Sequence, residues 1–176
     1  FEQPVRAKAC FDVPLAHTNP DAWCRIHPGA EARPSFALWG DSHGLQVLEA
    51  FEAAARTAGR SGVFTGFSGC APLLGVVPLT RPDQDRLDCV GLNQRMLAYA
   101  RDNGIRDVFL VAKWSYYTDR WNGSSYINAL GQRPGEPVSV ENSRRAFSAG
   151  FAATLAAYAA LGARVHVLEQ VPPHLL

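Results

Sequence analysis

Residues 36–43 read FALWGDSH, an apolar run that ends in a glycine and three polar residues. Such a run predicts a short buried strand followed by a tight turn. Beyond it, apolar side chains recur at helical spacing at Leu45, Leu48, Phe51, Ala55 and Ala58. This period predicts a helix, for which Gly59 is a suitable stop. Ser42 is therefore expected where the first strand turns into the first helix, as the residue that caps the helix.

Strands and helices alternate along the rest of the chain. Further strands are predicted over residues 63–67, 107–112 and 164–168, and further helices over about 90–103 and 141–161. The run at 107–112 is apolar on both faces, which is typical of a central parallel strand covered by helices. This order predicts an α/β fold with a doubly wound, flavodoxin-like parallel sheet and right-handed crossovers.

Polar or glycine-rich stretches follow each predicted strand. They are Ser42, residues 66–69, residues 113–117 and residues 169–173. Ligands of doubly wound sheets bind at the carboxyl ends of the strands. The sequence therefore predicts a functional site at this edge.

Ser42 could act there as a nucleophile, because a helix N-terminus presents free N–H groups that stabilise an oxyanion. The alternative is a capping serine without chemistry, which is the common role of serine at this position. Asp41 could orient the loop or form an ordinary Asx-turn. His43 is expected to point away from Ser42, although a role as its base stays open. An Asp41–His43 metal pair would lack a third ligand, so neither a metal nor a cofactor is expected.

The composition is that of a globular domain without a dominant charge. Of 176 residues, 47% are hydrophobic, and 17 basic side chains stand against 16 acidic ones. No basic run exceeds two residues, so no nucleic-acid partner is expected. No apolar stretch approaches the roughly 18–20 residues that cross a bilayer.

Four cysteines allow three disulfide pairings or four free thiols in a cytosolic protein. Each lies beside a loop rich in Pro or Asp, which favours disulfides and an oxidising compartment. The preferred pairing is the local one, Cys10 with Cys24 and Cys70 with Cys89, because it closes two short loops. The lack of a CxxC pair argues against a zinc ribbon or a thioredoxin-type site.

Aromatic residues gather in the loop after the strand at 107–112. They are Trp114, Tyr116, Tyr117, Trp121 and Tyr126. Flat aromatic faces beside the predicted site suit stacking on sugar rings. The alternative is that several of them pack the loop against the domain.

Several motifs together resemble one family. They are LWGDSHG at 38–44, GCAPL at 69–73 followed by Cys89, VAKWSY at 111–116, EQVP at 169–172, and the leading pair Cys10 and Cys24. The combination is similar to SGNH/GDSL hydrolases. More narrowly, it resembles the SGNH domains fused to membrane-bound acyltransferase-3 proteins, which O-acylate bacterial surface polysaccharides. The resemblance covers nearly the whole chain.

The resemblance implies roles for the residues at the strand ends. Ser42 would be the nucleophile and its own N–H an oxyanion donor, with Asp41 and His43 in support. Gly66 or Gly69 would supply the second donor.

The third block of the family contains an asparagine, and here the corresponding stretch reads AKWS at 112–115. This departure leaves Trp114 and Ser115 as the candidates for the third oxyanion position. Tyr116, Tyr117 and Trp121 are the candidates for substrate binding.

The implied activity is O-acyl transfer, with acetyl as the expected group, to a bacterial cell-surface polysaccharide such as lipopolysaccharide. The implied partner is an acyl-donating transmembrane acyltransferase domain, expected on the same polypeptide. These roles would place the domain in the periplasm or at the extracytoplasmic face of the inner membrane. A carbohydrate acetyl-esterase and a non-catalytic glycan-binding module are the alternatives.

The domain organisation follows from the lack of periodicity in the proline-rich residues 1–34 and, for the rest of the chain, from the same resemblance. Residues 1–34 are expected to form a disulfide-stapled, loop-rich lead-in, and residues 35–176 an SGNH-type domain with four of the usual five strands. The Asp-x-x-His block that carries the base in the family does not occur, and His174 is expected in a loop. The chain alone is therefore expected to be inactive, with its base in a longer parent chain.

Overall fold

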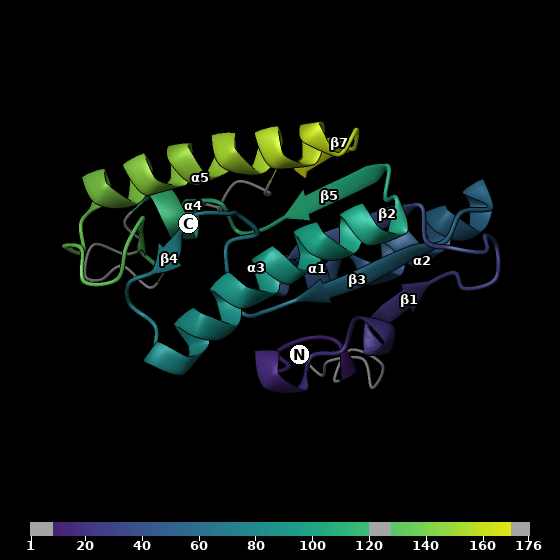
Figure 1. Cartoon of the computed structure of the whole chain (residues 1–176), viewed down its shortest axis with the longest axis horizontal. Helices are drawn as coiled ribbons and strands as arrows, with labels where there is room; N and C mark the ends of the chain where they lie inside the picture. The colour runs from purple at the N-terminus through teal and green to yellow at the C-terminus, as the bar shows by residue number, and fades with distance from the viewer. Residues whose placement is uncertain (1–8, 120–127, 170–176) are drawn as a thin grey trace, which may run out of the picture.

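A five-stranded sheet organises the protein. The computed structural model describes residues 9–119 and 128–169, whose arrangement Figure 1 shows. The strands lie in the order β1, β3, β2, β5, β7. Their bounds in that order are Cys24–Ile26, Gly62–Gly66, Phe36–Gly40, Asp107–Val111 and Arg164–Leu168. The pairs from β3 to β7 are parallel, so the predicted α/β fold with a parallel sheet is confirmed.

The edge strand β1 comes from the segment expected to be a loop-rich lead-in. It pairs antiparallel with β3 and follows two short 3-10 helices, η2 (Leu15–His17) and η3 (Pro20–Ala22). The Cys10–Cys24 disulfide ties the start of this segment to β1. The lead-in therefore covers an edge of β3 that would otherwise present unpaired backbone groups.

Helices cover both faces of the sheet (Figure 1). On one face lie α1 (Ser42–Gln46) and α2 (Leu48–Ala58), and on the other α3 (Asp83–Asn103) and α5 (Val140–Ala160). From β2 the chain passes to β3 on one side and later to β5 on the other. The direction of winding thus reverses at the carboxyl ends of β2 and β5, which is where doubly wound sheets bind their ligands.

The helix predicted after residue 42 differs from the expectation in two ways. It is interrupted at Val47, so that α1 has five residues and α2 eleven. Its N-cap is Asp41 rather than Ser42, because Asp41 has an extended backbone and accepts a hydrogen bond from the His43 N–H. Ser42 is instead the first helical residue.

The second predicted helix starts earlier than expected, at Asp83 instead of near residue 90. Its first two turns are polar and carry the exposed Leu87, so they lack the apolar stripe that marks a helix in a sequence. Asp83 and Asp85 in the first turn suit the positive end of the helix.

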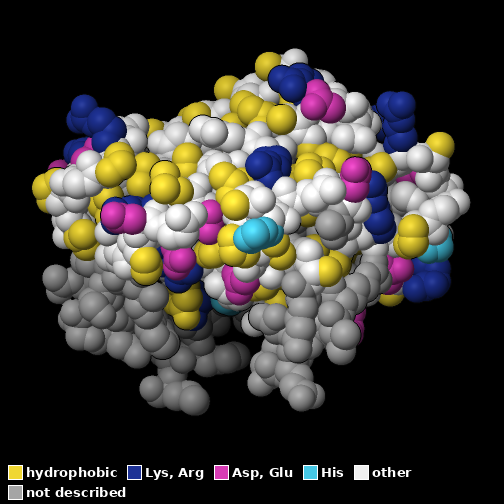
Figure 2. Space-filling model, turned by 60° about the horizontal axis from the view of Figure 1, so that its bottom comes forward, with side chains coloured by type: hydrophobic (Ala, Val, Ile, Leu, Met, Phe, Trp, Pro, Cys, Tyr) yellow, Lys and Arg dark blue, Asp and Glu magenta, His cyan; other side chains and the backbone are white. Residues whose placement is uncertain are grey.

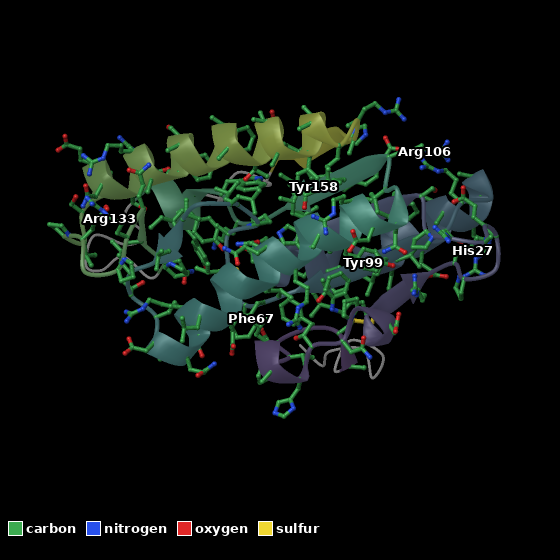
Figure 3. All side chains as sticks on the ribbon, in the orientation of Figure 1. His27, Phe67, Tyr99, Arg106, Arg133 and Tyr158 are labelled. Carbon is green, nitrogen blue, oxygen red and sulfur yellow. A yellow bond between two sulfur atoms is a disulfide. The ribbon has the colours of Figure 1, made fainter. Side chains whose placement is uncertain are left out.

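The core consists of two layers on the sheet and a third cluster beyond its carboxyl edge. Tyr99 of α3 and Tyr158 of α5 belong to one layer (Figure 3). The layer under α1 and α2 contains Leu45, Leu48, Phe64 and Val111 among others. The third cluster packs α4 (Ser115–Thr118) and the small ribbon of β4 (Val77–Pro78) and β6 (Leu130–Gly131) against α5.

Glycines let the carboxyl ends of the central strands approach closely. A Cβ on Gly40 would collide with the Val111 carbonyl oxygen, and one on Gly66 with the Gly40 carbonyl oxygen. The glycine that ends the first predicted strand is therefore required for contact between β2 and β5 as well as for the turn.

Both preferred disulfides are present, Cys10–Cys24 and Cys70–Cys89, and the described residues include no free cysteine. On the face shown in Figure 2, basic and acidic side chains are interspersed, as the balanced composition predicts. Within 9–119 and 128–169, no helix is both long and apolar enough to cross a membrane.

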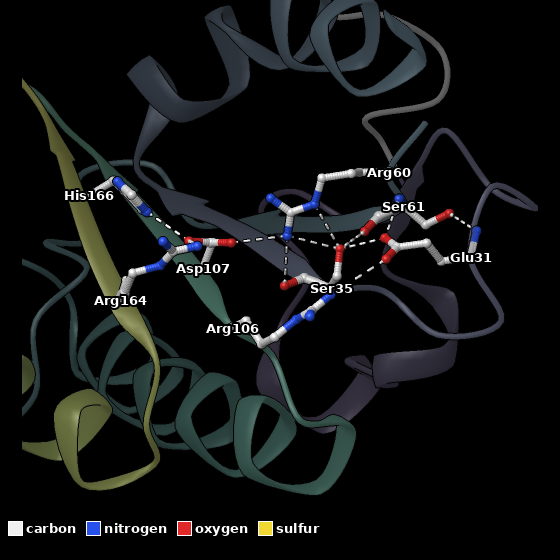
Figure 4. Close-up of polar contacts among 8 residues, drawn as sticks. All are labelled: Glu31, Ser35, Arg60, Ser61, Arg106, Asp107, Arg164 and His166. Atoms are coloured by element: carbon white, nitrogen blue, oxygen red, sulfur yellow. Dashed lines mark hydrogen bonds and ion pairs between the residues drawn. The ribbon is translucent and has the colours of Figure 1, made fainter. Parts of the chain in front are cut away.

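The amino end of the sheet holds a charged network around Asp107 (Figure 4). The Asp107 side chain is 3% exposed and pairs with Arg60, Arg164 and His166, each at 2.9 Å. Burial opposes its charge, but the bonds from His166 and Arg60 outweigh this effect and lower the pKa of Asp107. This cluster lies at the end of the sheet opposite to the predicted site.

Candidate active site

Asp41 anchors the turn that carries Ser42. Its side chain is buried and accepts three hydrogen bonds, from the His43 N–H at 2.8 Å, the Lys113 N–H at 3.0 Å and the Tyr117 hydroxyl at 2.9 Å. The carboxylate thus joins the end of β2 to the residues that follow β5. An orienting role for Asp41 is the one that this geometry supports.

Tyr117 is one of the most buried side chains of the protein, with 1% exposure. Burial, together with the Asp41 charge, raises the pKa of Tyr117 well above its ordinary value. The phenol is therefore a neutral donor to Asp41 over the physiological range. Its ring cannot stack on a sugar, so the expectation of a substrate-binding role for Tyr117 is not compatible with its burial.

Ser42 is half-buried at the start of α1. Among the described residues, neither its hydroxyl nor its N–H forms a hydrogen bond. The N–H that follows, that of His43, is taken by Asp41. Ser42 therefore offers an uncommitted hydroxyl and an uncommitted backbone donor at the same place.

The His43 ring lies beside Asp41 and Tyr116. Its Nδ1 atom is 3.5 Å from Asp41 Oδ1 without a hydrogen bond, and its ring meets Tyr116 edge-on at 6.4 Å. The Lys113 ammonium lies 3.8 Å from the centre of the Tyr116 ring. His43 forms no hydrogen bond with Ser42, which agrees with the expectation that it points away.

Of the two candidate oxyanion glycines, Gly69 has the more suitable environment. Gly66 is the last residue of β3, and the Gly40 carbonyl fills the space where its Cβ would lie. Gly69 lies in the following loop at a φ of +63°, and its N–H has no acceptor among the described residues.

Three contacts hold the Gly69 loop. Asp12 accepts hydrogen bonds from the Ser68 N–H at 2.6 Å and from the Ser68 hydroxyl at 2.7 Å. The Cys70–Cys89 disulfide joins the loop to α3. The Asn93 side chain donates from α3 to the carbonyls of residues 71 and 73, at 3.0 and 2.9 Å.

The remaining predicted residues have different surroundings. The Trp114 indole N–H donates to the Leu168 carbonyl at 2.8 Å, and its ring packs against Phe147 and Phe151. Its indole is thus committed to the fold rather than to an oxyanion. Ser115 begins α4, Tyr116 is half-buried beside Lys113, and Trp121 lies outside the described residues.

Two polar residues near Gly69 were not predicted. A Cβ on Gly69 would lie 2.7 Å from Asn128 Oδ1 and 3.2 Å from Arg81 Nη1. Arg81 is paired with Asp85 at 3.1 Å. No local signal marks either residue in the sequence, because their position depends on the β4–β6 ribbon. In the described part of the chain, no three His, Cys, Asp or Glu side chains are grouped to hold a metal ion.

Comparison with known families agrees with this geometry. A family model described as "SGNH domain (fused to AT3 domains)" matches residues 9–175, which include β1, both disulfides and the whole sheet. No match was found among curated proteins or among solved structures. The resemblance of the sequence motifs is thereby confirmed, and the chain belongs to the family of SGNH domains that are fused to AT3 domains.

Proposed function

We propose that this domain transfers an acyl group, in the simplest case acetyl, to a hydroxyl of a bacterial cell-surface polysaccharide through an acyl-enzyme on Ser42. The observation that carries the proposal is the pair of uncommitted groups on Ser42, held at the switch point of the sheet by the buried Asp41. Membership in a family fused to acyltransferase domains supports acyl transfer or ester cleavage as the reaction class.

The reaction has two balanced steps. In the first, Ser42 Oγ bonds to the acyl carbon of the donor, the donor's bond to that carbon breaks, and the serine proton passes through a base to the leaving group. In the second, a sugar hydroxyl attacks the acyl carbon, loses its proton to the base, and Ser42 leaves with its proton restored. In both steps the Ser42 and Gly69 N–H groups would stabilise the oxyanion.

The base in this proposal is a histidine oriented by a carboxylate, as in serine hydrolases generally. His43 is not arranged for that task, because its Nδ1 faces Asp41 and it forms no hydrogen bond with Ser42. We therefore propose that the base belongs to a segment of the parent protein other than the described residues.

The proposed partner is a transmembrane acyltransferase domain on the same polypeptide, which would deliver the acyl donor. The proposed location is the extracytoplasmic side of the bacterial inner membrane. Fusion to AT3 domains within the family and the two disulfides support both proposals.

The test is an esterase and transferase assay of the full-length protein with p-nitrophenyl acetate. Ser42→Ala should lower kcat by at least 10³-fold, because the nucleophile is lost. Ser148→Ala, at an exposed serine of α5, is the matched control and should leave kcat unchanged. Full activity in the Ser42 variant would exclude the acyl-enzyme.

The same assay separates transfer from hydrolysis. A polysaccharide acceptor should compete with water for the acyl-enzyme and give an acylated glycan, detectable by mass spectrometry. Release of acetate alone, whatever the acceptor concentration, would identify a carbohydrate esterase instead.

A further inference from the structure

Asp41 fixes the backbone on both sides of Ser42. Its Oδ1 atom accepts a hydrogen bond from the His43 N–H at 2.8 Å, and its own N–H donates to the Val111 carbonyl of β5 at 3.3 Å. Its carbonyl oxygen accepts from the Gly44 N–H at 2.9 Å. Because Ser42 lies between residues that these bonds hold, a shift of the Asp41 carboxylate would move the Ser42 hydroxyl as well.

Tyr117 holds the other oxygen of this carboxylate. Asp41 Oδ2 accepts hydrogen bonds from the Tyr117 hydroxyl at 2.9 Å and from the Lys113 N–H at 3.0 Å. Within the described residues, Tyr117 is the one side chain that donates to Asp41, because the other two donors are backbone N–H groups. Hydrogen bonds to a carboxylate are stronger than those between neutral groups. The phenol is thus the anchor of Asp41 that a side-chain substitution can remove.

The surroundings of Tyr117 confine its hydroxyl to this task. The side chain is 1% exposed, and burial together with the Asp41 charge raises the pKa of the phenol well above its ordinary value. The proton therefore stays on the oxygen and is available to Asp41. Because the ring is shielded from solvent, Tyr117 does not touch a substrate, and its influence on the reaction must pass through Asp41.

Two neighbouring elements hold the backbone around Tyr117. The buried Ser143 hydroxyl of α5 donates to the Tyr117 carbonyl at 2.5 Å and accepts from the Leu130 N–H of β6 at 2.9 Å. Arg144 of α5 donates to the Thr118 carbonyl at 2.8 Å. The helix α4 is therefore fixed to α5 and to the β4–β6 ribbon, and the Tyr117 side chain connects this fixed position to the turn after β2.

We propose that Tyr117 is a positioning residue for acyl transfer, whose hydroxyl holds the Asp41 carboxylate so that Ser42 keeps its place for attack on the donor. This role rests on the proposed acyl-enzyme function. Since Tyr117 contacts neither the substrate nor the reacting atoms, its loss should slow the chemical step and leave substrate binding unchanged. A misplacement of about 1 Å in a reacting group can cost on the order of 10²-fold in rate.

The test compares Tyr117→Phe with the wild-type full-length protein in the p-nitrophenyl acetate assay. Phenylalanine keeps the ring in its buried place and removes only the hydroxyl. We expect kcat to fall by about 10–100-fold, with KM within about threefold of wild type. Phosphorylation of Ser42 by diethyl p-nitrophenyl phosphate, followed by the release of p-nitrophenol, should slow by a similar factor.

A double-mutant cycle with Asp41 distinguishes positioning from a general loss of stability. In an Asp41→Asn background, Tyr117→Phe should lower kcat by less than about threefold, because the carboxylate through which Tyr117 acts is already absent. Two effects on kcat that simply multiply would overturn the role. A folded Tyr117→Phe variant with wild-type kcat would overturn it as well.

Tyr99→Phe is the matched control for the loss of a buried hydroxyl. Tyr99 of α3 is 6% exposed, and its hydroxyl accepts a hydrogen bond from Arg25 of β1 at 2.9 Å. This variant should lower the midpoint of urea unfolding much as Tyr117→Phe does, but its kcat should stay within about twofold of wild type. An equal loss of kcat in both variants would show that Tyr117 has no particular tie to the reaction.

Ser143→Ala is the second variant, for the case that Tyr117→Phe does not fold. It leaves the phenol in place but frees the Tyr117 carbonyl from α5. It should lower kcat by at least about threefold at an unchanged KM, because the support of the Tyr117 hydroxyl is loosened. Wild-type kcat in this variant would contradict the proposed path from α5 through Tyr117 to Asp41.

The outcomes also separate this role from the function on which it rests. An inactive wild type, or an active Ser42→Ala variant, would refute the acyl-enzyme and the role of Tyr117 with it. An active wild type and an inactive Ser42→Ala variant, combined with wild-type kcat in Tyr117→Phe, would refute the role of Tyr117 alone.

Discussion

At the scale of single residues, neighbours in the sequence have different tasks. Asp41 is buried and uses its carboxylate to hold residues 113 and 117, whereas Ser42 keeps its hydroxyl and N–H uncommitted. Gly40 is needed because the β5 carbonyl of Val111 leaves no space for a side chain. Residues 40–42 thus combine a glycine that allows close strand contact, a buried anchoring carboxylate and the proposed nucleophile in three consecutive positions.

A substitution of Gly69 gives a prediction for both stability and activity at this scale. Gly69→Ala should destabilise the protein and lower kcat, because its φ is +63° and the new Cβ would press on Asn128 at 2.7 Å. Backbone strain alone costs roughly 1 kcal/mol for alanine at such a φ, and the contact adds to it. Urea unfolding and the esterase assay measure the two effects.

Gly75→Ala is the matched control for that variant. Gly75 has a φ of +71° and nothing within 4 Å of its would-be Cβ. Gly75→Ala should lower the unfolding free energy only by the cost of backbone strain, and its kcat should stay at the wild-type value. Equal losses of kcat in the two variants would contradict the proposed place of Gly69 in the site.

Single residues of the site were predictable where local sequence sets their position. Ser42 lies two residues after the end of β2 and Gly69 three residues after the end of β3, so the pattern of apolar runs places both near the strand ends, with Gly66 as the alternative to Gly69. The Asp41–Tyr117 bond and the position of Asn128 were not predictable, because they join residues more than 70 positions apart or depend on a two-residue ribbon. The missed cap at Asp41 shows that Asp and Ser compete for the same role at a helix start.

At the scale of elements, the strands match the prediction closely and the helix ends less so. Apolar runs of five residues define the strands, but α3 begins in a polar stretch and α1 is only five residues long. The short strand β1 was missed, since three residues between proline-rich turns carry no readable period. The loop after β3 depends on packing against α3 through Asn93 and a disulfide.

The two disulfides should therefore differ in their effect on activity. Replacing both cysteines of either pair with alanine should cost about 3 kcal/mol of unfolding free energy, because each closes a loop of similar length. Only the Cys70–Cys89 variant should also lower kcat, since that bond holds the loop of Gly69. Urea unfolding and the esterase assay on both double variants test this, and a drop in kcat confined to the Cys10–Cys24 variant would contradict it.

At the scale of the whole molecule, the two ends of the sheet are specialised differently. The carboxyl end carries the uncommitted groups of the site, and the amino end carries fully paired charges around Asp107 (Figure 4). Hydrogen bonding by Ser35 and the Ser61 backbone lowers the pKa of Glu31 in the same region. These contacts join β5 and β7 to the segments that directly precede β2 and β3, at one end of the fold.

The unfolding free energy of the molecule should consequently depend on pH in the acid range, because of Asp107. Because folding lowers the pKa of Asp107 below its unfolded value of about 3.9, its contribution is complete above that pH and disappears as the pH falls through the folded pKa. Asp107→Asn should lower the unfolding free energy at pH 7 by about 2 kcal/mol. The difference from wild type should shrink as the pH falls through the folded pKa of Asp107, because the wild-type side chain then becomes neutral as well.

Asp102→Asn, at an exposed carboxylate near the end of α3, is the control for this pH series. It should change the unfolding free energy by less than about 0.5 kcal/mol at either pH. A deficit in Asp107→Asn that stays constant from pH 7 to acid would show that the carboxylate charge is not its origin.

The Asp41 anchor also sets an order of events during folding. Its partners Lys113 and Tyr117 lie 72 and 76 residues further along the chain. A nascent chain that has emerged only as far as β3 contains Ser42, but Asp41 then has neither partner to bind. Ser42 can take the position that the Asp41 contacts give it only after β5 has joined the sheet and α4 has formed, so the domain matures late and as a unit.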